Sequence, residues 1–418
     1  MTSAAEAENV LQRMINEASP GDVIKVPAGE YSGPIVVDKP LTVQSNGAAT
    51  IRGSQLDPVI TVLSEQVTLD GLKIIHQSPD KDTRAILVEG NHHNLNNLTI
   101  RTDGYGIVLR DAHQSRITEN TITGNADRPV SERQNGIDLF GSHDNVIANN
   151  DIIYVHDGVY MERSEDNKVT QNHVTNSRYG FHLMFTEGTI LSQNQSEQNV
   201  TGAMVMGTRE TSVRDNQFSE QLNHVYAQGL LLYDVQNAEV HHNVINANLV
   251  GMLIQDSKEN RIYQNHVAAN FIGVQLLNAE HNDIFENNFV ANVVSGQAQH
   301  SAFNRVQGNY WDSHMGLDLD GDDHSEMAFR ADPFFYTIVK DKPAFQIFFQ
   351  APGMVFMENL LKSDTNLWMT DTAPLIEPVT ESEVENRSSS LLFIGFSVLL
   401  LLYSFYFIYF GGIRKYET

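Results

Sequence analysis

Three consecutive segments of equal length decide the fold: NDIIYVHDGVYMERSEDNKVTQ (residues 150–171), NHVTNSRYGFHLMFTEGTILSQ (172–193) and NQSEQNVTGAMVMGTRETSVRD (194–215). Each begins with an asparagine and carries a glycine eight residues later. The same asparagine recurs farther along the chain, at Asn216, Asn243, Asn265, Asn287 and Asn309. Every step is 22 residues, apart from one step of 27. A fixed period of this length predicts a solenoid, in which each repeat buries its apolar face against its neighbours.

The residues around each glycine indicate the type of solenoid. The first and third residues after the glycine are apolar in every repeat, whereas the second and fourth are mixed. After Gly180, Phe181 and Leu183 alternate in this way with His182 and Met184. Such alternation is typical of strands with one face inside, and there is no helical stretch in the repeat. We therefore predict an all-β solenoid, a right-handed parallel β-helix with coils of about 22 residues and an internal asparagine ladder at a coil corner that tolerates a left-handed turn.

The chain is predicted to begin with a capping helix that leads into the solenoid. Within residues 1–20, four apolar side chains share one helical face: Val10, Leu11, Met14 and Ile15. A helix there would cover the open end of the β-helix, as solenoids require for solubility. The β-helix itself is predicted over residues 21–312, with insertions near residues 127–133 and 222–227.

An irregular tail and a transmembrane helix are predicted after the solenoid. Residues 313–390 combine an acidic turn, an aromatic and Met-rich stretch and a flexible linker. Residues 391–413 carry no charge and are long enough to cross a hydrocarbon core of about 30 Å as a helix. Because Arg414 and Lys415 follow directly, we expect residues 414–418 in the cytoplasm and the solenoid outside. This topology needs an export signal, and we expect that one is missing from the start of the sequence.

The composition excludes several classes of function. The chain has 52 acidic and 27 basic side chains and a formal charge of -25, without a basic patch. A nucleic-acid partner is therefore not expected. The absence of cysteine excludes thiolate metal ligands and a cysteine nucleophile.

The outward-facing strand positions hold a soft set of metal donors. Because stacked coils lie about 4.8 Å apart, we expect His182 beside Met204, and Met184 beside Met206, on an open and exposed surface. Imidazole and thioethers together suit Cu(I). A methionine-rich surface for a protein partner, or simple gap-filling, is the alternative interpretation.

A second candidate metal site follows the last coil. Asp318, Asp320 and Asp322 have a spacing that could hold a hard cation such as Ca²⁺. The EF-hand pattern is not met, since Gly321 is at the fourth place and Phe329 at the twelfth. A solvated acidic turn is the alternative.

Enzymes also have to be considered, since many β-helices are polysaccharide lyases, hydrolases or epimerases. Asp138, Asp157 and Glu162 could in principle supply acid–base chemistry. Long insertions that would build a carbohydrate cleft are missing, however, and a hydrophobic His/Met surface suits a sugar acid poorly. We therefore do not expect an enzyme.

Five segments together resemble the NosD family. They are RYGFHLMF (178–185), GAMVM (202–206), GNYWDSH (308–314), DLDGD (318–322) and DTAPL (371–375). The likeness spans residues 21–378, and the conjunction of the coil repeats with the Asn-Tyr-Trp segment and the tail makes it specific. His182, Met184 and Met206 match the family's strand motif, whereas Met204 replaces a small residue.

NosD proteins are extracytoplasmic β-helix proteins required to mature nitrous oxide reductase. The resemblance implies a component that handles copper and works with an ABC transporter, made of a cytoplasmic ATPase and a membrane permease, and with a copper lipoprotein. The missing signal and the C-terminal span depart from the family, and an anchor would suit a cell without an outer membrane. The membrane, the transporter and the reductase are thus the expected partners.

Two functions from different classes follow. The first is an extracytoplasmic maturation factor that delivers copper to the metal centres of nitrous oxide reductase. The second is a membrane-anchored polysaccharide lyase or uronate epimerase on the same fold. Release of unsaturated uronate that survives metal removal would favour the second.

The topology can be tested with protease added to intact cells. With Arg414 and Lys415 inside, the protease should remove the solenoid and leave a short membrane stub, which an antibody to the C-terminus would detect after lysis. Full protection of the solenoid would contradict the proposed orientation.

Overall fold

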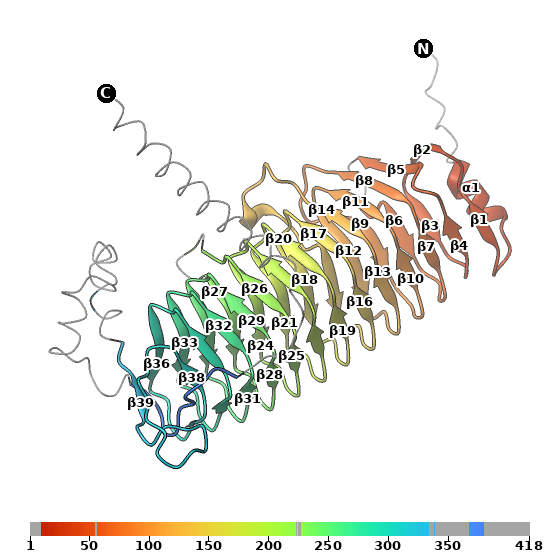
Figure 1. The fold of residues 1–418 in the computed structure, drawn as a ribbon. Coiled ribbons are helices and arrows are strands. Elements are labelled where there is room, and N and C mark those ends of the chain that lie inside the picture. Colours follow the sequence, from red (N-terminus) through yellow and green to blue (C-terminus); the bar gives the residue numbers. More distant parts are fainter. Residues whose placement is uncertain are drawn as a thin grey trace, which may run out of the picture. The chain divides into compact units, whose positions relative to one another are not determined.

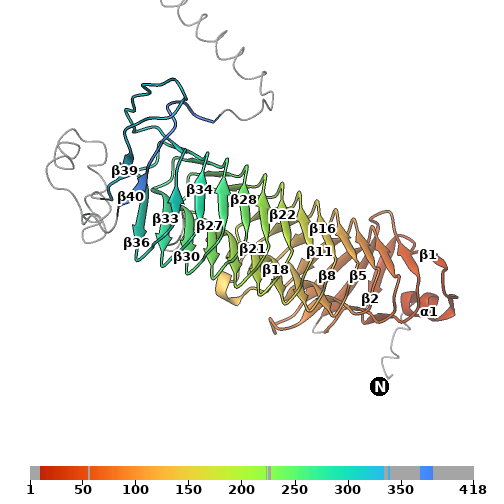
Figure 2. The same cartoon turned by 90° about the horizontal axis from the view of Figure 1, so that it is seen from below.

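The computed structural model describes residues 10–54, 57–222, 224, 227–333, 338 and 368–379. The chain divides into two units, Met1–Pro378 and Val379–Thr418. The first unit is a right-handed parallel β-helix of about 13 turns (Figure 1), as the 22-residue period predicts. Each turn contributes one strand to each of three parallel sheets, which are seen from below in Figure 2.

The first sheet has 13 short strands in the order of the sequence. They are β1 (Val23–Lys25), β4 (Thr42–Gln44), β7 (Thr68–Asp70), β10 (Asn94–Asn96), β13 (Arg116–Thr118), β16 (Val146–Ala148), β19 (Lys168–Thr170), β22 (Ile190–Ser192), β25 (Ser212–Arg214), β28 (Glu239–His241), β31 (Arg261–Tyr263), β34 (Asp283–Phe285) and β37 (Arg305–Val306).

The second sheet also has 13 strands and meets the first at a tight corner. They are β2 (Gly29–Ser32), β5 (Ala49–Ser54), β8 (Lys73–Gln77), β11 (Thr99–Thr102), β14 (Thr121–Thr123), β17 (Asp151–Ile153), β20 (His173–Thr175), β23 (Gln195–Glu197), β26 (Gln217–Ser219), β29 (Val244–Asn246), β32 (His266–Ala268), β35 (Asn288–Val290) and β38 (Tyr310–Trp311).

The third sheet has 12 strands, and these include the longer strands that follow the glycine pattern. They are β3 (Ile35–Val37), β6 (Ile60–Val62), β9 (Arg84–Val88), β12 (Tyr105–Arg110), β15 (Ile137–Phe140), β18 (Asp157–Glu162), β21 (Tyr179–Met184), β24 (Thr201–Met206), β27 (Gln228–Tyr233), β30 (Val250–Gln255), β33 (Ile272–Leu277) and β36 (Val294–Gln299). Beyond the solenoid, β39 (Phe329–Ala331) pairs antiparallel with β40 (Met369–Asp371).

The inward positions of the third sheet contribute to the core together with those of the other two sheets. The predicted inward residues Phe181, Leu183, Ala203 and Val205 are all completely buried, like their equivalents in the other coils. The glycine that precedes them is required by close packing: a Cβ at Gly180 would collide with the Ser196 side chain and with a backbone carbonyl of the next coil. The period-two interpretation of these strands is therefore confirmed.

The helix α1 (Val10–Glu17) covers the N-terminal end of the solenoid. Leu11 and Ile15 are completely buried in the core, but Val10 is 48% exposed, so its assignment to the buried face was wrong. Gln12 donates to the carbonyl of Val36 (3.0 Å) and accepts from the amide of Val36 (2.7 Å). The helix thus satisfies an open strand edge as well as covering the core.

The first insertion is a short 3-10 turn, η1 (Val130–Glu132), that returns the chain to the third sheet. The second insertion, near residues 222–227, does not disturb the register, because Asn216 and Asn243 stack as directly as their neighbours. Among the described residues, no helix is long and apolar enough to span a membrane. Residues 391–413, predicted to do so, lie outside the described residues.

The asparagine ladder runs along the corner between the first and second sheets. The backbone N–H and the Nδ2 of Asn172 both donate to Oδ1 of Asn194, at 2.9 and 3.0 Å, and Nδ2 also donates to the carbonyl of Ile147 at 2.9 Å. The same pattern links these members in order: Asn120, Asn150, Asn172, Asn194, Asn216, Asn243, Asn265, Asn287 and Asn309. All of them are buried.

The left-handed turn lies one residue earlier than the sequence predicts. The residue before each ladder asparagine has positive φ, for example 56° at Gln171 and at Gln193. Asn172 and Asn194 themselves do not. The left-handed residue turns the chain sharply, and the asparagine that follows can then direct its amide along the solenoid axis.

The ladder ends on a carboxylate that the tail supplies. Asp371 Oδ2 accepts from the backbone N–H and Nδ2 of Asn309, both at 2.9 Å, and from Nε1 of Trp311 at 3.0 Å. Asp371 is completely buried. A carboxylate only accepts hydrogen bonds, so it suits the end of a ladder in which each asparagine donates to the next one.

Replacing Asn194 by alanine tests how much the ladder stabilises the fold. The change would leave two buried N–H donors of Asn172 without their acceptor, and each lost acceptor costs roughly 1–3 kcal/mol. We expect a clear fall in the urea midpoint, measured by circular dichroism. Gln195→Ala, at the exposed next residue, should change stability by less than about 0.5 kcal/mol. Equal midpoints for the two variants would contradict a stabilising ladder.

Candidate metal site on the third sheet

The strands β21 and β24 bring the four predicted copper ligands into register. His182 lies opposite Met204, and Met184 lies opposite Met206. Adjacent strands of a sheet are about 4.8 Å apart, so the side chains of each pair are neighbours. This predicted juxtaposition is confirmed, and it places one imidazole and three thioethers on the outer face of two adjacent coils.

The surroundings of His182 are more enclosed than the sequence predicts. The methionines are half-buried, but His182 is only 7% exposed, so the expectation of an open and exposed site was wrong for this residue. The reason is aromatic packing: Tyr160 on β18 and Tyr179 on β21 present their rings edge-on to the imidazole, with centroids at 5.0 and 5.1 Å. Two tyrosines therefore screen the imidazole from water.

A buried carboxylate holds the other side of the imidazole. Asp157, at the start of β18, accepts from Nδ1 of His182 at 2.8 Å. The same carboxylate receives two bonds from Arg178, Nε to Oδ1 at 2.8 Å and Nη2 to Oδ2 at 2.7 Å. Asp157 is completely buried, so both partners act on it away from bulk solvent.

The electrostatics of this cluster favour the ionised carboxylate. Burial alone would raise the pKa of Asp157, but the hydrogen bonds and charges of His182 and Arg178 outweigh it, and the pKa lies below its ordinary value. Burial would likewise lower the pKa of Arg178, yet the contact with Asp157 raises it. Asp157 and Arg178 therefore form a stable ion pair beneath the imidazole.

The second imidazole nitrogen is the feature that points to a ligand. Nε2 of His182 is buried and has no hydrogen-bond partner among the described residues. Buried polar atoms without partners are uncommon and need an explanation. With methionines on the next strand and at the end of its own, a soft cation such as Cu(I) fits this donor set.

The carboxylates considered for acid–base catalysis are engaged elsewhere. Asp138 binds Arg110 and Asn135, each at 2.7 Å, and its burial raises its pKa. Glu162 accepts from the hydroxyl of Tyr160 at 2.8 Å. Burial and this hydrogen bond raise the pKa of Tyr160. The tyrosine therefore stays protonated and is not available as a general base.

Sequence reasoning predicted that the four candidate ligands lie side by side but missed how the imidazole is held. Strict alternation assigns Asp157 to the inner face, together with Val159, so counting residues could not bring it to His182. The contact arises where β18 begins, next to Gly158. The ion pair between Arg178 and Asp157 could have been predicted from the sequence. The two residues are 21 apart, which is close to one coil, and they carry opposite charges.

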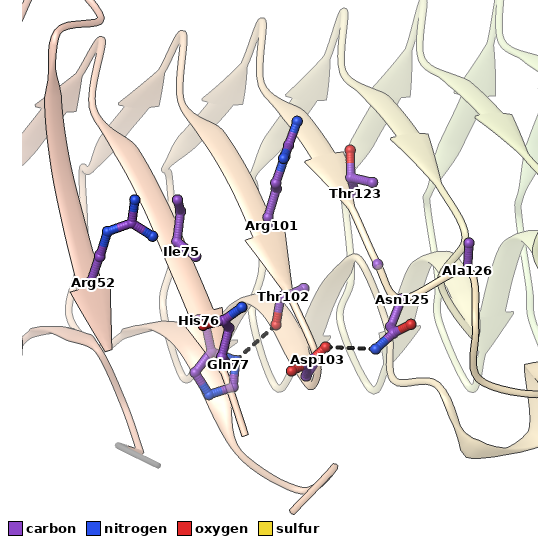
Figure 3. A pocket seen from close by; sticks show the side chains of 11 residues that line it. Arg52, Ile75, His76, Gln77, Arg101, Thr102, Asp103, Thr123, Asn125 and Ala126 are labelled. Carbon is purple, nitrogen blue, oxygen red and sulfur yellow. Dashed lines mark hydrogen bonds between the residues drawn. The ribbon is translucent and has the colours of Figure 1, made fainter. Parts of the chain in front are cut away.

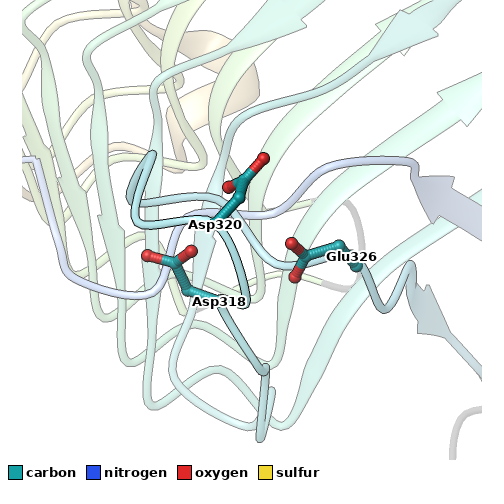
Figure 4. Close-up of side chains that lie close together, drawn as sticks. All are labelled: Asp318, Asp320 and Glu326. Atoms are coloured by element: carbon teal, nitrogen blue, oxygen red, sulfur yellow. The ribbon is translucent and has the colours of Figure 1, made fainter.

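The predicted calcium ligands are only partly brought together. The carboxylates of Asp318, Asp320 and Glu326 lie within 4.8 Å of one another (Figure 4). Asp322 is not in this group and instead accepts from the backbone amide of His324 at 3.0 Å. The turn is not periodic, which is why spacing alone did not predict its geometry.

These carboxylates also serve their own loop. Asp318 accepts from the backbone N–H of Gly321 at 2.7 Å, which lowers its pKa, and Glu326 accepts from the N–H of Leu319 at 3.1 Å. A calcium ion is not needed to explain the cluster.

A cavity of about 480 Å³ lies on the second sheet, far along the chain from the candidate ligands (Figure 3). Its walls include Arg52 on β5 and Arg101 on β11, with Asn125 closing one side. Arg52 pairs with Glu30 at 2.9 Å. None of the lining residues belongs to the third sheet, so the cavity is separate from the site at His182.

Comparison with protein families places this geometry in context. Residues 125–316 match a family model described as "Periplasmic copper-binding protein (NosD)", and these residues include all four candidate ligands. The chain thus resembles the NosD family over nearly half of its length. Residues 9–195 also match a family described as a protein of unknown function (DUF1565).

Curated relatives also carry the name NosD. A "Probable ABC transporter binding protein NosD" from Pseudomonas aeruginosa is 25% identical over 142 residues, and one of the same name from Stutzerimonas stutzeri is 24% identical over 138 residues. The first match covers 31% of this chain and the second 32%. The chain matches only 32% of the length of either relative.

Solved structures share the fold of this chain. A Yersinia enterocolitica family 28 exopolygalacturonase is 10% identical, with a TM-score of 0.57, covering 72% of this chain and 75% of its own. The alginate lyase AlyF-OU02 is 14% identical, with a TM-score of 0.54, covering 74% and 84%. At these identities the likeness shows the β-helix fold alone.

The ion pair beneath the imidazole should matter more than an exposed pair. Arg178→Met would leave Asp157 buried without its main cation, and breaking such a pair costs roughly 3–5 kcal/mol. Arg52→Met breaks an exposed pair with Glu30 and should leave stability unchanged. Urea midpoints of the two variants measure the difference. A midpoint for Arg178→Met equal to that of the wild type would show that the pair is not stabilising.

Proposed function

We propose that this chain is an extracytoplasmic copper-handling protein that binds Cu(I) through His182, Met184, Met204 and Met206. In this proposal it is not an enzyme, and copper is its cargo. It passes the metal on for the metal centres of nitrous oxide reductase, together with an ABC transporter. The proposal extends the family's printed description, a periplasmic copper-binding protein, to particular residues.

One observation carries the proposal. The buried Nε2 of His182 lacks a partner among the described residues, and it belongs to a residue whose neighbour on the next strand is Met204. A second pair, Met184 and Met206, continues the same two strands. One imidazole and several thioethers form a soft ligand set, which favours Cu(I) over Zn²⁺ or Mg²⁺.

The ligand set also suits transfer. Three of the four donors are half-buried methionines, whose flexible side chains can change partners without moving the backbone. The cluster contains no thiolate, since the chain has no cysteine, and therefore lacks the strongest Cu(I) ligand of proteins. A partner protein with additional donors could take copper from such a site.

The names of the curated relatives support an ABC transporter as a partner. Both curated NosD proteins carry the printed name ABC transporter binding protein. We extend this to a permease and its ATPase as partners, with a copper lipoprotein as the donor and nitrous oxide reductase as the recipient. Residues 391–413 would anchor the protein at the outer face of the membrane, with residues 414–418 in the cytoplasm.

A polysaccharide lyase or uronate epimerase is the alternative. The shared fold supports it only at low identity. Against it, Asp138, Asp157 and Glu162 are each engaged in a contact, and the pKa of Tyr160 is raised rather than lowered. The arginines that could bind a sugar acid, Arg52 and Arg101, line a cavity on another sheet.

A competition titration with a Cu(I) chelator tests the site. We expect the purified full-length chain to retain Cu(I), and the double variant Met184→Leu/Met206→Leu to retain much less. The matched control is Met161→Leu/Met252→Leu, because these two methionines lie on the same sheet but face the core. Exchanges of Leu and Met usually cost less than about 1.5 kcal/mol, so both double variants should fold.

The same variants should be compared in copper transfer to nitrous oxide reductase. Activity of the recipient should fall with the outward-facing double variant and not with the core control. Equal copper retention by the wild type and the outward-facing variant would reject the metal site. The methionines would then be interpreted as a hydrophobic docking surface.

A further inference from the structure

We propose that Asp157 and Arg178 are positioning residues that hold His182 in the one tautomer whose Nε2 lone pair is available to a metal. This inference rests on the proposed copper site, but it concerns residues that neither the sequence pattern nor the family description assigns. It follows from the contacts that join Asp157, Arg178 and Tyr179 to one another and to the imidazole ring of His182.

The tautomer follows from the donor and acceptor atoms. A carboxylate can only accept, so the 2.8 Å contact between Nδ1 of His182 and Oδ2 of Asp157 requires the hydrogen on Nδ1. A neutral imidazole has a single N–H group, and Nε2 is then a bare acceptor. The opposite tautomer would set the Nδ1 lone pair against a carboxylate oxygen and bury an N–H at Nε2 without an acceptor among the described residues. Both consequences are unfavourable, so the arrangement selects one form.

Arg178 fixes the carboxylate that makes this selection. Its guanidinium forms two parallel bonds to Asp157, and this forked geometry allows the carboxylate one orientation. The guanidinium also lies over the ring of Tyr179, 4.2 Å from the centroid. Tyr179 in turn contacts the imidazole of His182 edge-on. The contacts thus close a loop, and His182 can neither tilt nor rotate without breaking one of them.

The order of these parts in the fold supports a positioning role. Asp157 belongs to β18, His182 to the next strand β21, and the methionine Met204 to β24. Carboxylate, imidazole and thioether therefore succeed one another along the solenoid axis. In metal sites, a carboxylate behind a histidine sets the ring orientation and raises its basicity, and its loss costs about 10–100-fold in metal affinity.

The chain offers a matched control for this role. Asp138 lies one coil earlier than Tyr160, is also buried, and is also paired with an arginine, Arg110 at 2.7 Å. It makes no hydrogen bond to His182 among the described contacts. Asp138→Asn and Asp157→Asn therefore each replace a buried, arginine-paired carboxylate of the same sheet by an amide, and only the second acts on the imidazole.

The first experiment reads the tautomer without copper. The metal-free full-length chain is labelled with ¹⁵N-histidine, and the His182 signals are assigned by their absence in His182→Gln. We expect a protonated Nδ1 and an unprotonated Nε2 in the wild type and in Asp138→Asn, and a mixture of tautomers in Asp157→Asn. A hydrogen on Nε2 in the wild type would overturn the proposal, even if the Asp157 variant failed to fold.

The second experiment measures Cu(I) retention by the same three proteins. Asp157→Asn should lower the affinity about 10–100-fold, whereas Asp138→Asn should match the wild type. Equal affinities for the wild type and a folded Asp157→Asn would reject the positioning role and leave the copper site standing. A wild type that holds no Cu(I) would reject the proposed function, while the tautomer measurement would still decide how Asp157 acts on His182.

Discussion

The structure depends on one constraint, the in-register stacking of coils that the asparagine ladder enforces. Each ladder asparagine donates twice to the next asparagine and once to a backbone carbonyl, as Asn194 does with Asn216 and with the carbonyl of Val169. These groups are buried, so a shift of register would leave donors and acceptors unpaired on both sides. The ladder is also directional. The bonds from one asparagine to the next all run toward the C-terminal end, where the buried carboxylate of Asp371 receives the last two.

The same constraint determines what a site on this protein can be. Residues one coil apart are neighbours, whatever their side chains, because the backbone register is set at the corner and not at the site. An insertion does not alter this rule: Asn216 and Asn243 are separated by 27 residues and still form the standard ladder contact. The outer faces are therefore free to carry columns of unlike residues. One such column consists of Tyr160, His182 and Met204. These side chains are neighbours because the backbone strands stack in register, and not because of contacts among themselves.

This division explains which features the sequence predicts and which it does not. The period predicts the β-helix, the core residues Phe181 and Leu183, and the pairing of His182 with Met204, since all of these depend on backbone register alone. The burial of His182 depends on the rings of Tyr160 and Tyr179. This kind of side-chain packing does not repeat with the 22-residue period, so the period could not predict it. The contact with Asp157 was missed because alternation fails at the start of a strand. Among the candidate ligands of the acidic turn, Asp322 is not grouped with Asp318 and Asp320, and spacing could not predict this because no stacking fixes that loop.

Rigid stacking also limits how a metal could leave the site. Separating β21 from β24 would break both the strand pairing and the ladder contact between their coils. Release of the metal by opening the solenoid would therefore cost much free energy. The imidazole is held from behind by Asp157 and Arg178, which leaves it little freedom to swing away. The methionines are the adaptable donors, since their side chains are half-buried and unbranched. Under the proposed function, release would therefore proceed by exchange of thioethers for a partner's donors while His182 stays in place, which makes the imidazole the fixed ligand and the methionines the exchangeable ones.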